Sequence, residues 1–284
     1  MSERRAQVRS LLGDSVPLGA ALKAAELAKS TWFYRAHPRE PRALRPQVLA
    51  LLREVTGYEL TYGYRKLTAW LGRKGLWINR KSVLRHTRAL AMTQPKKRKG
   101  PRFTVLARVT PTEANTYWEG DFTPVDDREG RSWVCAIVDP AQGSRPVSGE
   151  LSERCRAREA CKVLEEAILA AFPADGRVPT GQKLILRVDR GGQFIAQAFR
   201  DTAQGLGVTL EYCGVRCPDD KPNIEAFFSC YKIEEVYRNE YRTREEARTG
   251  WNRWREWYIN ERLHSRLGYR PPVECELQLA QVTA

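Results

Sequence analysis

Apolar residues near the start of the chain recur at helical spacing. Leu18, Leu22 and Leu27 can share one face of a helix. Ser15 is a candidate N-cap for that helix, and a short second helix is expected over residues 30–35. Such a pair resembles the end of a helix-turn-helix, although this pattern alone does not specify one.

Three further amphipathic segments follow, over residues 44–56, 62–75 and 78–92. Asn79 is a natural N-cap for the third segment. Its inward-facing positions are expected to be Val83, Leu84 and Leu90. Its outer face carries the basic residues Arg80, Lys81, Arg85 and Arg88. A short helix with a basic outer face after a tight turn is typical of DNA recognition, and an ordinary three-helix domain with a solvated basic face is the alternative.

Beyond residue 114 the period changes from helical to alternating, which predicts strands. Along residues 115–125, one side of the strand presents Trp118, Gly120 and Phe122. The other side presents Glu119, Asp121 and Thr123. A turn leads into a second strand over 133–139, which makes a hairpin, and a third short strand is expected over 145–151.

The rest of the chain alternates between helices and strands. An amphipathic helix over 157–172 precedes a short apolar strand, 183–189, of the kind that is buried in a parallel sheet. A helix through Phe199, a strand over 208–213 and two final helices, from Pro222 and over 243–264, complete the series. This order predicts an α/β domain with a mixed five-stranded sheet flanked by helices, preceded by an all-α region.

Charge divides the chain in the same place as the periodicity. Residues 1–102 hold 23 Lys and Arg against 6 Asp and Glu, whereas the remainder holds 25 against 28. A basic first third indicates a polyanion-binding region. The segment 94–102 is nearly all basic and bracketed by proline, so it is expected to be a linker that can also follow a phosphate backbone through Lys96, Lys97, Arg98 and Lys99. We therefore expect domains over 1–93 and 113–284 joined by a linker over 94–112.

Several classes of protein are disfavoured by composition. No apolar run approaches the roughly 18 residues of a membrane span, and no signal peptide precedes the first helix, so a cytoplasmic location is expected. The seven cysteines form no CxxC pair and only three histidines are present, which argues against a zinc finger. Scattered cysteines in odd number are typical of reduced thiols.

Three carboxylates stand where they can meet in the expected sheet. Asp121 lies on its first strand, Asp189 follows the buried parallel strand, and Glu225 lies in the first turn of the helix that begins at Pro222. Hard oxygen ligands of this kind suit Mg²⁺ or Mn²⁺, and two such ions can break and join phosphodiesters. Composition alone does not separate these three residues from other acids, including Asp126, Asp127, Asp139, Asp219 and Asp220.

A resemblance to a known protein family selects Asp121, Asp189 and Glu225 from among these acids. WEGDFT, VDRGGQF and NIEAFFSCYKIE resemble the three carboxylate motifs of the DDE transposases of bacterial insertion sequences, with 35 residues between Asp189 and Glu225. WYINERLHSRLGYRPPVE resembles the C-terminal signature of that family, and YGYRKLTAWLGRKG with NRKSVLRHTRAL resembles its helix-turn-helix. The likeness is to the OrfB subunit of the insertion-sequence-three family, covers residues 55–275, and extends distantly to retroviral integrases.

The resemblance implies an RNase H-like catalytic domain that cleaves element ends and transfers the 3′-hydroxyl strand to target DNA. Asp121, Asp189 and Glu225 would be the catalytic metal ligands for two Mg²⁺ or Mn²⁺ ions, and Lys232 would contact the DNA end. It further implies double-stranded DNA partners, namely terminal inverted repeats and target. It also implies a homo-oligomer on paired ends, an upstream OrfA partner or fusion, and a nucleoid-associated location.

The sequence departs from the family pattern near the site. Arg187 and Val188 replace the usual His-Ser before the second aspartate, and Lys221 replaces the asparagine four residues before the glutamate. Residues beside metal ligands orient those ligands, so these changes bear on the chemistry. Two alternatives therefore remain at this point: a catalytically decayed DNA-binding regulator derived from a transposase, and a simple RNase H-type nuclease that cuts without joining.

Overall fold

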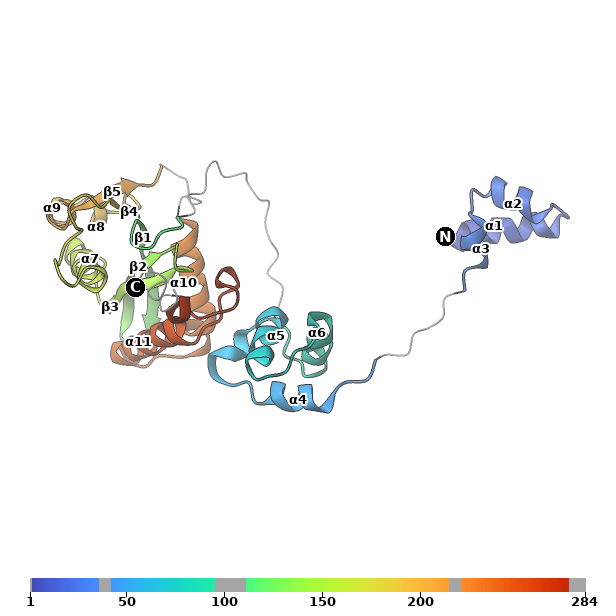
Figure 1. Cartoon of the computed structure of the whole chain (residues 1–284), viewed down its shortest axis with the longest axis horizontal. Helices are drawn as coiled ribbons and strands as arrows, with labels where there is room; N and C mark the ends of the chain where they lie inside the picture. The colour runs from blue at the N-terminus through green and yellow to red at the C-terminus, as the bar shows by residue number, and fades with distance from the viewer. Residues whose placement is uncertain (1, 36–41, 95–110, 215–220, 276–284) are drawn as a thin grey trace. The chain divides into compact units, whose positions relative to one another are not determined.

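The computed structural model describes residues 2–35, 42–94, 111–214 and 221–275 (Figure 1). The chain divides into two compact units, Met1–Ala43 and Leu44–Ala284. In the parts that the structure describes, no helix is long and apolar enough to cross a membrane. The expected linker over 94–112 lies almost entirely outside the described residues, so its role as a domain boundary stays a prediction.

The first unit is a small bundle of three helices, α1 (Ser2–Gly13), α2 (Leu18–Ala24) and α3 (Lys29–Phe33). Its core consists of Val8, Ala21, Leu22, Ala25 and Leu27. The helix α1 was not expected from the sequence. Ser15 is not an N-cap as expected, because its backbone is left-handed, with φ of 63°, and Pro17 occupies the position before α2. Leu18 packs against this core and is partly exposed.

The second unit begins with the helices α4 (Pro46–Arg53), η1 (Gly57–Thr61), α5 (Tyr64–Arg73) and α6 (Arg80–Ala89). Asn79 caps α6 as expected, because its Oδ1 accepts from the backbone N–H of Lys81 at 2.8 Å. His86 of α6 is fully buried: its Nε2 accepts from the Arg45 N–H at 2.8 Å and its Nδ1 lies 2.7 Å from the Ser82 oxygen. These contacts tie α6 to the start of α4.

A mixed five-stranded sheet forms the centre of the second unit and confirms the expected α/β sheet. Its strands are β1 (Tyr117–Asp127), β2 (Gly130–Asp139), β3 (Arg145–Ser152), β4 (Leu184–Val188) and β5 (Val208–Tyr212), arranged in the order β3-β2-β1-β4-β5. The first three strands pair antiparallel, whereas β4 pairs parallel with both β1 and β5. The parallel pairs bring the carboxyl end of β4 beside the middle of β1.

Helices cover both faces of the sheet (Figure 1). On one face lie α7 (Ala157–Ala171), α8 (Gly192–Ile195) and α9 (Gln197–Gly205), packed on a core that includes Trp118, Ile137 and Leu186. On the other face lie α10 (Pro222–Glu234) and α11 (Arg244–Asn260), packed on Val134, Ala136 and Val138. The short helices η3 (Val236–Arg238) and η4 (Ser265–Leu267) follow them, and Gly268 caps η4 with a left-handed backbone.

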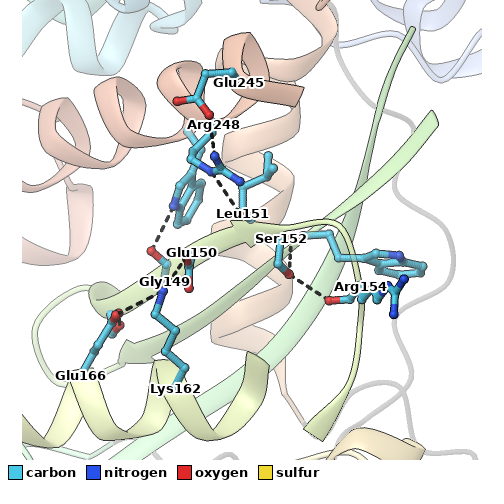
Figure 2. A network of polar contacts seen from close by, with 12 residues as sticks. Gly149, Glu150, Leu151, Ser152, Arg154, Lys162, Glu166, Glu245 and Arg248 are labelled. Atoms are coloured by element: carbon cyan, nitrogen blue, oxygen red, sulfur yellow. Dashed lines mark hydrogen bonds and ion pairs between the residues drawn. The ribbon is translucent and has the colours of Figure 1, made fainter. Parts of the chain in front are cut away.

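The edge strand β3 is held by helices on both of its sides (Figure 2). Lys162 of α7 donates to the Glu150 carboxylate at 2.7 Å. On the other side, the Trp251 indole of α11 donates to the Gly149 carbonyl at 3.1 Å. A Cβ atom at Gly149 would lie 2.7 Å from the Trp251 ring, so glycine is required for α11 to approach the strand this closely.

The α4–α6 region packs on the last helix of the unit. The Tyr58 ring lies 4.7 Å from the Trp257 ring, centroid to centroid, and the Tyr62 hydroxyl accepts from the Leu263 N–H at 2.9 Å. Val48, Leu52 and other residues of this region belong to the same hydrophobic core as α10 and α11. These contacts explain why the division between compact units falls at Ala43 instead of after α6.

A buried ion pair joins α10 to the segment after α11. Arg262 and Glu234 keep only 8% and 7% of their side chains exposed, and Arg262 Nη2 and Nε lie 2.7 and 2.9 Å from the two carboxylate oxygens. Burial together with the positive charge of Arg262 lowers the pKa of the adjacent His264 to about 2. His264 is therefore neutral, and its role is structural.

Candidate active site

The pairing of β1 with β4 brings two aspartates to one place. Glu119 of β1 pairs with Arg187 of β4 in parallel register, so Asp121 and Asp189, each two residues further along, come side by side. Asp121 points to the face covered by α10, the side that the alternating pattern predicts. Its Oδ1 accepts from the Phe122 N–H at 2.8 Å, which fixes the carboxylate.

A tight turn after β4 holds the second aspartate. Asp189 Oδ1 accepts from the Gly191 N–H at 2.7 Å. A Cβ atom at Gly191 would lie 2.8 Å from that same Oδ1 and 2.5 Å from the Gln193 amide, so a larger residue here would displace the Asp189 and Gln193 side chains. The Asp189 side chain keeps 42% of its surface exposed, whereas Asp121 keeps 22%. One carboxylate therefore lies deep in the site and the other at its rim.

The ammonium group of Lys221 lies between these two carboxylates. Its Nζ is 3.2 Å from Asp121 Oδ2 and 3.5 Å from Asp189 Oδ2, and it donates to the Gly120 carbonyl at 3.4 Å. Only 7% of the Lys221 side chain is exposed. Sequence comparison marks this lysine as a departure from the family pattern, yet gives no indication that it reaches both aspartates.

Burial dominates the electrostatics of Asp121. Desolvation raises the pKa of the Asp121 carboxyl above its ordinary value, and the neighbouring Asp189 raises it further. The Lys221 ammonium and the hydrogen bond from Phe122 act in the opposite direction. Two close carboxylates, one of them desolvated, are stabilised when a cation binds between them.

A third acid, Glu119, fixes the helix that carries Glu225. Glu119 is 1% exposed, and its Oε2 accepts from the backbone N–H groups of Asn223 and Ile224 at 2.9 and 2.8 Å. Its Oε1 accepts from the Asn223 amide at 2.7 Å. Burial raises the pKa of Glu119, although these hydrogen bonds oppose the shift. Sequence reasoning assigned no role to Glu119, whose position on the Asp121 side of β1 is the signal that could have found it.

Glu225 lies in the first turn of α10, as expected, with its side chain exposed. Its backbone N–H donates to the Lys221 carbonyl at 3.2 Å, although Lys221 itself precedes the helix and has a non-helical backbone. Glu225 therefore stands one turn beyond the lysine that occupies the aspartate pair. Among the described residues, no three acids, cysteines or histidines are already grouped as a metal site.

The site fits a divalent metal by its donor chemistry. Two carboxylate oxygens converge on one cationic nitrogen, and hard oxygen donors of this type are preferred by Mg²⁺ and Mn²⁺. Asp121 and Asp189 would provide the first ligands, and Glu225, in the first turn of α10, would complete the set.

The residues expected to contact DNA lie in several places. Arg80, Lys81 and Arg88 are exposed on α6, whereas Arg85 is partly buried and reaches the Ser82 hydroxyl at 3.4 Å, so it does not point straight outward as expected. Lys232 is partly exposed on α10. The remaining expected residues, Lys96, Lys97, Arg98 and Lys99, lie outside the described part of the chain.

An exposed tryptophan stands beside the basic face of α6. Trp77 keeps 85% of its surface exposed and lines a surface pocket with Arg65, Arg80 and Arg270. A second pocket between α5 and α6 is lined in part by Arg65 and Arg88. Sequence reasoning did not single out Trp77, although an aromatic residue in the turn before a basic helix is a signal for nucleic-acid contact.

Comparison with known proteins gives consistent matches. Residues 111–218 and 206–272 each match an integrase core domain family. The chain is 25% identical to "Transposase for insertion sequence element IS629" of Shigella sonnei, over 93% of each chain. It is 24% identical to "Putative transposase InsK for insertion sequence element IS150" of Escherichia coli strain K12, over 96% of this chain and 98% of that one. The solved catalytic domain of Mos1 mariner transposase is similar with a TM-score of 0.43 and 17% identity, over 50% of this chain and 70% of that one.

Proposed function

We propose that the chain is an insertion-sequence transposase that cleaves the ends of a DNA element and joins them to target DNA, in keeping with its matches to the integrase core domain. The observation that carries the proposal is the convergence of Asp121 and Asp189, from neighbouring strands, on one cation position. Glu225, on the helix that Glu119 fixes, is the third catalytic acid of this proposal.

Asp121, Asp189 and Glu225 would hold Mg²⁺ or Mn²⁺, with two ions in the full site. Ions bound there activate an attacking oxygen and stabilise the leaving oxygen of a phosphodiester. In the first reaction, a water oxygen attacks phosphorus at the element end, and the bond to the 3′ oxygen breaks and leaves a 3′-hydroxyl. In the second, that hydroxyl attacks a target phosphodiester, so one phosphorus–oxygen bond forms as another breaks. Neither step links the protein covalently to DNA.

The other side chains of the site position these three acids. Glu119 accepts three hydrogen bonds from Asn223 and Ile224, which hold the first turn of α10 against β1. The turn closed by Gly191 holds Asp189 at the end of β4. Lys232, seven residues after Glu225 on the same helix, would contact the DNA end.

DNA binding is assigned to the basic helical region. Arg80, Lys81 and Arg88 give α6 an exposed basic face, and Trp77 adds an aromatic surface beside it. Arg85 is included in this proposal, although it is partly buried. The basic segment Lys96–Lys99 would follow the phosphate backbone, and the terminal inverted repeats of an element would be the preferred sequence.

Arg88→Ala is expected to weaken binding to an element-end duplex by about 1–3 kcal/mol if Arg88 reads a base edge. It should also lower the slope of log K against log salt by about one if Arg88 contacts a phosphate. Arg158→Ala removes the same charge from the exposed surface of α7 and is the matched control. Equal binding by the two variants in a salt titration would assign α6 to an ordinary three-helix domain.

The proposed function also includes the assembly of several copies of the chain on DNA. Transposition joins two element ends, which requires a homo-oligomer that pairs them. An upstream OrfA partner or fusion would supply a further helix-turn-helix, and the action on DNA would be associated with the bacterial nucleoid. Sedimentation of the full chain with and without duplex ends would show whether DNA brings chains together.

Nicking of supercoiled DNA separates the proposal from its alternatives. The full chain with Mg²⁺ or Mn²⁺ is expected to convert supercoiled plasmid carrying an element end into nicked circles, and chelation should stop the reaction. A decayed regulator would bind that plasmid without nicking it. A simple RNase H-type nuclease would cut an RNA–DNA hybrid instead. Either outcome would contradict the proposed function.

A further inference from the structure

The Lys221 ammonium has one nearby oxygen acceptor for each of its three protons. An ammonium has three protons, and three oxygen acceptors lie within 3.5 Å of Nζ: Asp121 Oδ2, Asp189 Oδ2 and the Gly120 carbonyl. The Lys221 side chain is buried, so its ammonium group lies inside the site and does not extend into solvent. The Lys221 ammonium thus places a positive charge at the centre of the candidate metal site.

The Lys221 ammonium and a divalent metal would bind the same oxygen atoms. The Oδ2 atoms of Asp121 and Asp189 both face Nζ, and they are the atoms that make a two-carboxylate site attractive to Mg²⁺ or Mn²⁺. A metal that binds them would stand beside a positive charge with little water to screen it. Metal and ammonium therefore compete for one position.

The local backbone allows the lysine to leave without unwinding α10. Lys221 precedes Pro222, the first residue of the helix, and its φ of −123° and ψ of 57° are not helical. Glu119 holds the next two residues, Asn223 and Ile224, through their N–H groups. The helix start is thus fixed independently of the Lys221 side chain.

We propose that Lys221 is an internal competitor that occupies the metal position until a divalent ion displaces its ammonium. The inference rests on the proposed function, because it takes Asp121 and Asp189 as metal ligands. Lys221 is a positioning residue that sets metal affinity, and it takes no part in bond breaking.

Metal affinity of the full chain tests this inference. If the ammonium occupies its position about 90% of the time, its removal should tighten Mn²⁺ binding about tenfold. Lys221→Asn and Lys221→Met are the test variants, and electron paramagnetic resonance of free Mn²⁺ measures affinity without any need for activity. Lys162→Met is the matched control, because Lys162 also pairs with a carboxylate, Glu150, which is on the edge strand β3 and outside the aspartate pair. It should bind Mn²⁺ like the wild type.

The outcomes separate the inference from the proposed function. Tighter binding by both Lys221 variants supports the competitor. Unchanged or weaker binding by folded variants overturns it, because the ammonium would then be neutral toward the metal or part of its site, and the transposase would stand. If Mn²⁺ fails to bind the wild type and both variants, or binds Asp189→Asn as well as the wild type, the metal site itself is misplaced and both proposals fall.

A labelling experiment on the wild type covers the case in which the variants do not fold. An amine-reactive reagent with mass-spectrometric readout should label Lys221 slowly in metal-free protein, because its side chain is 7% exposed, and rapidly after Mn²⁺ is added. Lys162, which is 54% exposed, should be labelled equally in both conditions. Protection of Lys221 that persists at saturating Mn²⁺ would show that the ammonium stays in place, which would overturn the inference.

Discussion

Asp121→Asn, Asp189→Asn and Glu225→Gln are each expected to reduce Mg²⁺-dependent strand cleavage by more than about 100-fold. Each change keeps the shape of the side chain and removes one negative charge from a proposed metal ligand. Loss of a group that merely orients a ligand already costs 10–100-fold in many metal enzymes, so loss of a ligand should cost more. Cleavage of an element-end duplex, followed on a denaturing gel, measures the effect.

DNA binding and folding should survive the same substitutions. The DNA contacts proposed for the basic face of α6 do not involve the three acids. Desolvation raises the pKa of Asp121, which means that its charged form is costly in the fold, so an uncharged asparagine is tolerated by the metal-free protein. Asp126→Asn is the control, because Asp126 pairs with Arg131 and is 68% exposed. Activity retained by the three variants, or lost in Asp126→Asn, would contradict the choice of acids.

Glu234→Gln is expected to destabilise the fold by about 3–5 kcal/mol, the largest stability effect anticipated for one substitution here. Burial alone would lower the pKa of Arg262, but the Glu234 carboxylate raises it above its ordinary value, so the guanidinium is charged at every accessible pH. Removal of the carboxylate charge leaves that guanidinium buried, with 8% of its side chain exposed and no countercharge at Glu234. Urea unfolding of the full chain, monitored by tryptophan fluorescence, measures the change in free energy.

Two further variants test whether the loss of stability comes from the buried Arg262–Glu234 ion pair. Glu150→Gln removes the partner of Lys162 from a pair in which the two side chains are 33% and 54% exposed, and it should cost less than about 1 kcal/mol. A double substitution, Glu234→Leu with Arg262→Met, removes both buried charges and should recover much of the loss. A Glu234→Gln protein as stable as Glu150→Gln would show that the pair does not hold α10 to the end of α11.

Local periodicity predicted the core of the catalytic domain correctly. Alternation along β1 put Trp118 on one face and Asp121 on the other, because a strand's period of two is a property of its own backbone. The strand ending near Asp189 and the helix starting at Pro222 were likewise located from apolar runs and proline. The mixed sheet of five strands was likewise expected, whereas its strand order was not predicted.

Features that depend on distant segments could not be predicted in this way. Lys221 was noticed only as a departure from a family pattern, since its position between two carboxylates needs β1, β4 and the start of α10 to meet. The helix α1 has few apolar positions, and Val8 becomes fully buried only because α2 covers it. Ser15 has the chemistry of an N-cap, but the backbone turns left-handed there and Pro17 precedes the helix instead.

Strand transfer tests the central claim most directly. Full-length protein, Mg²⁺ and a labelled element-end duplex with a free 3′-hydroxyl are incubated with supercoiled target plasmid, and products are treated with protease and denatured. The account predicts labelled strands covalently joined to plasmid, resistant to protease and absent with Asp189→Asn. Duplex that is bound but never joined, or an RNA–DNA hybrid that is cut without any joined product, would contradict it.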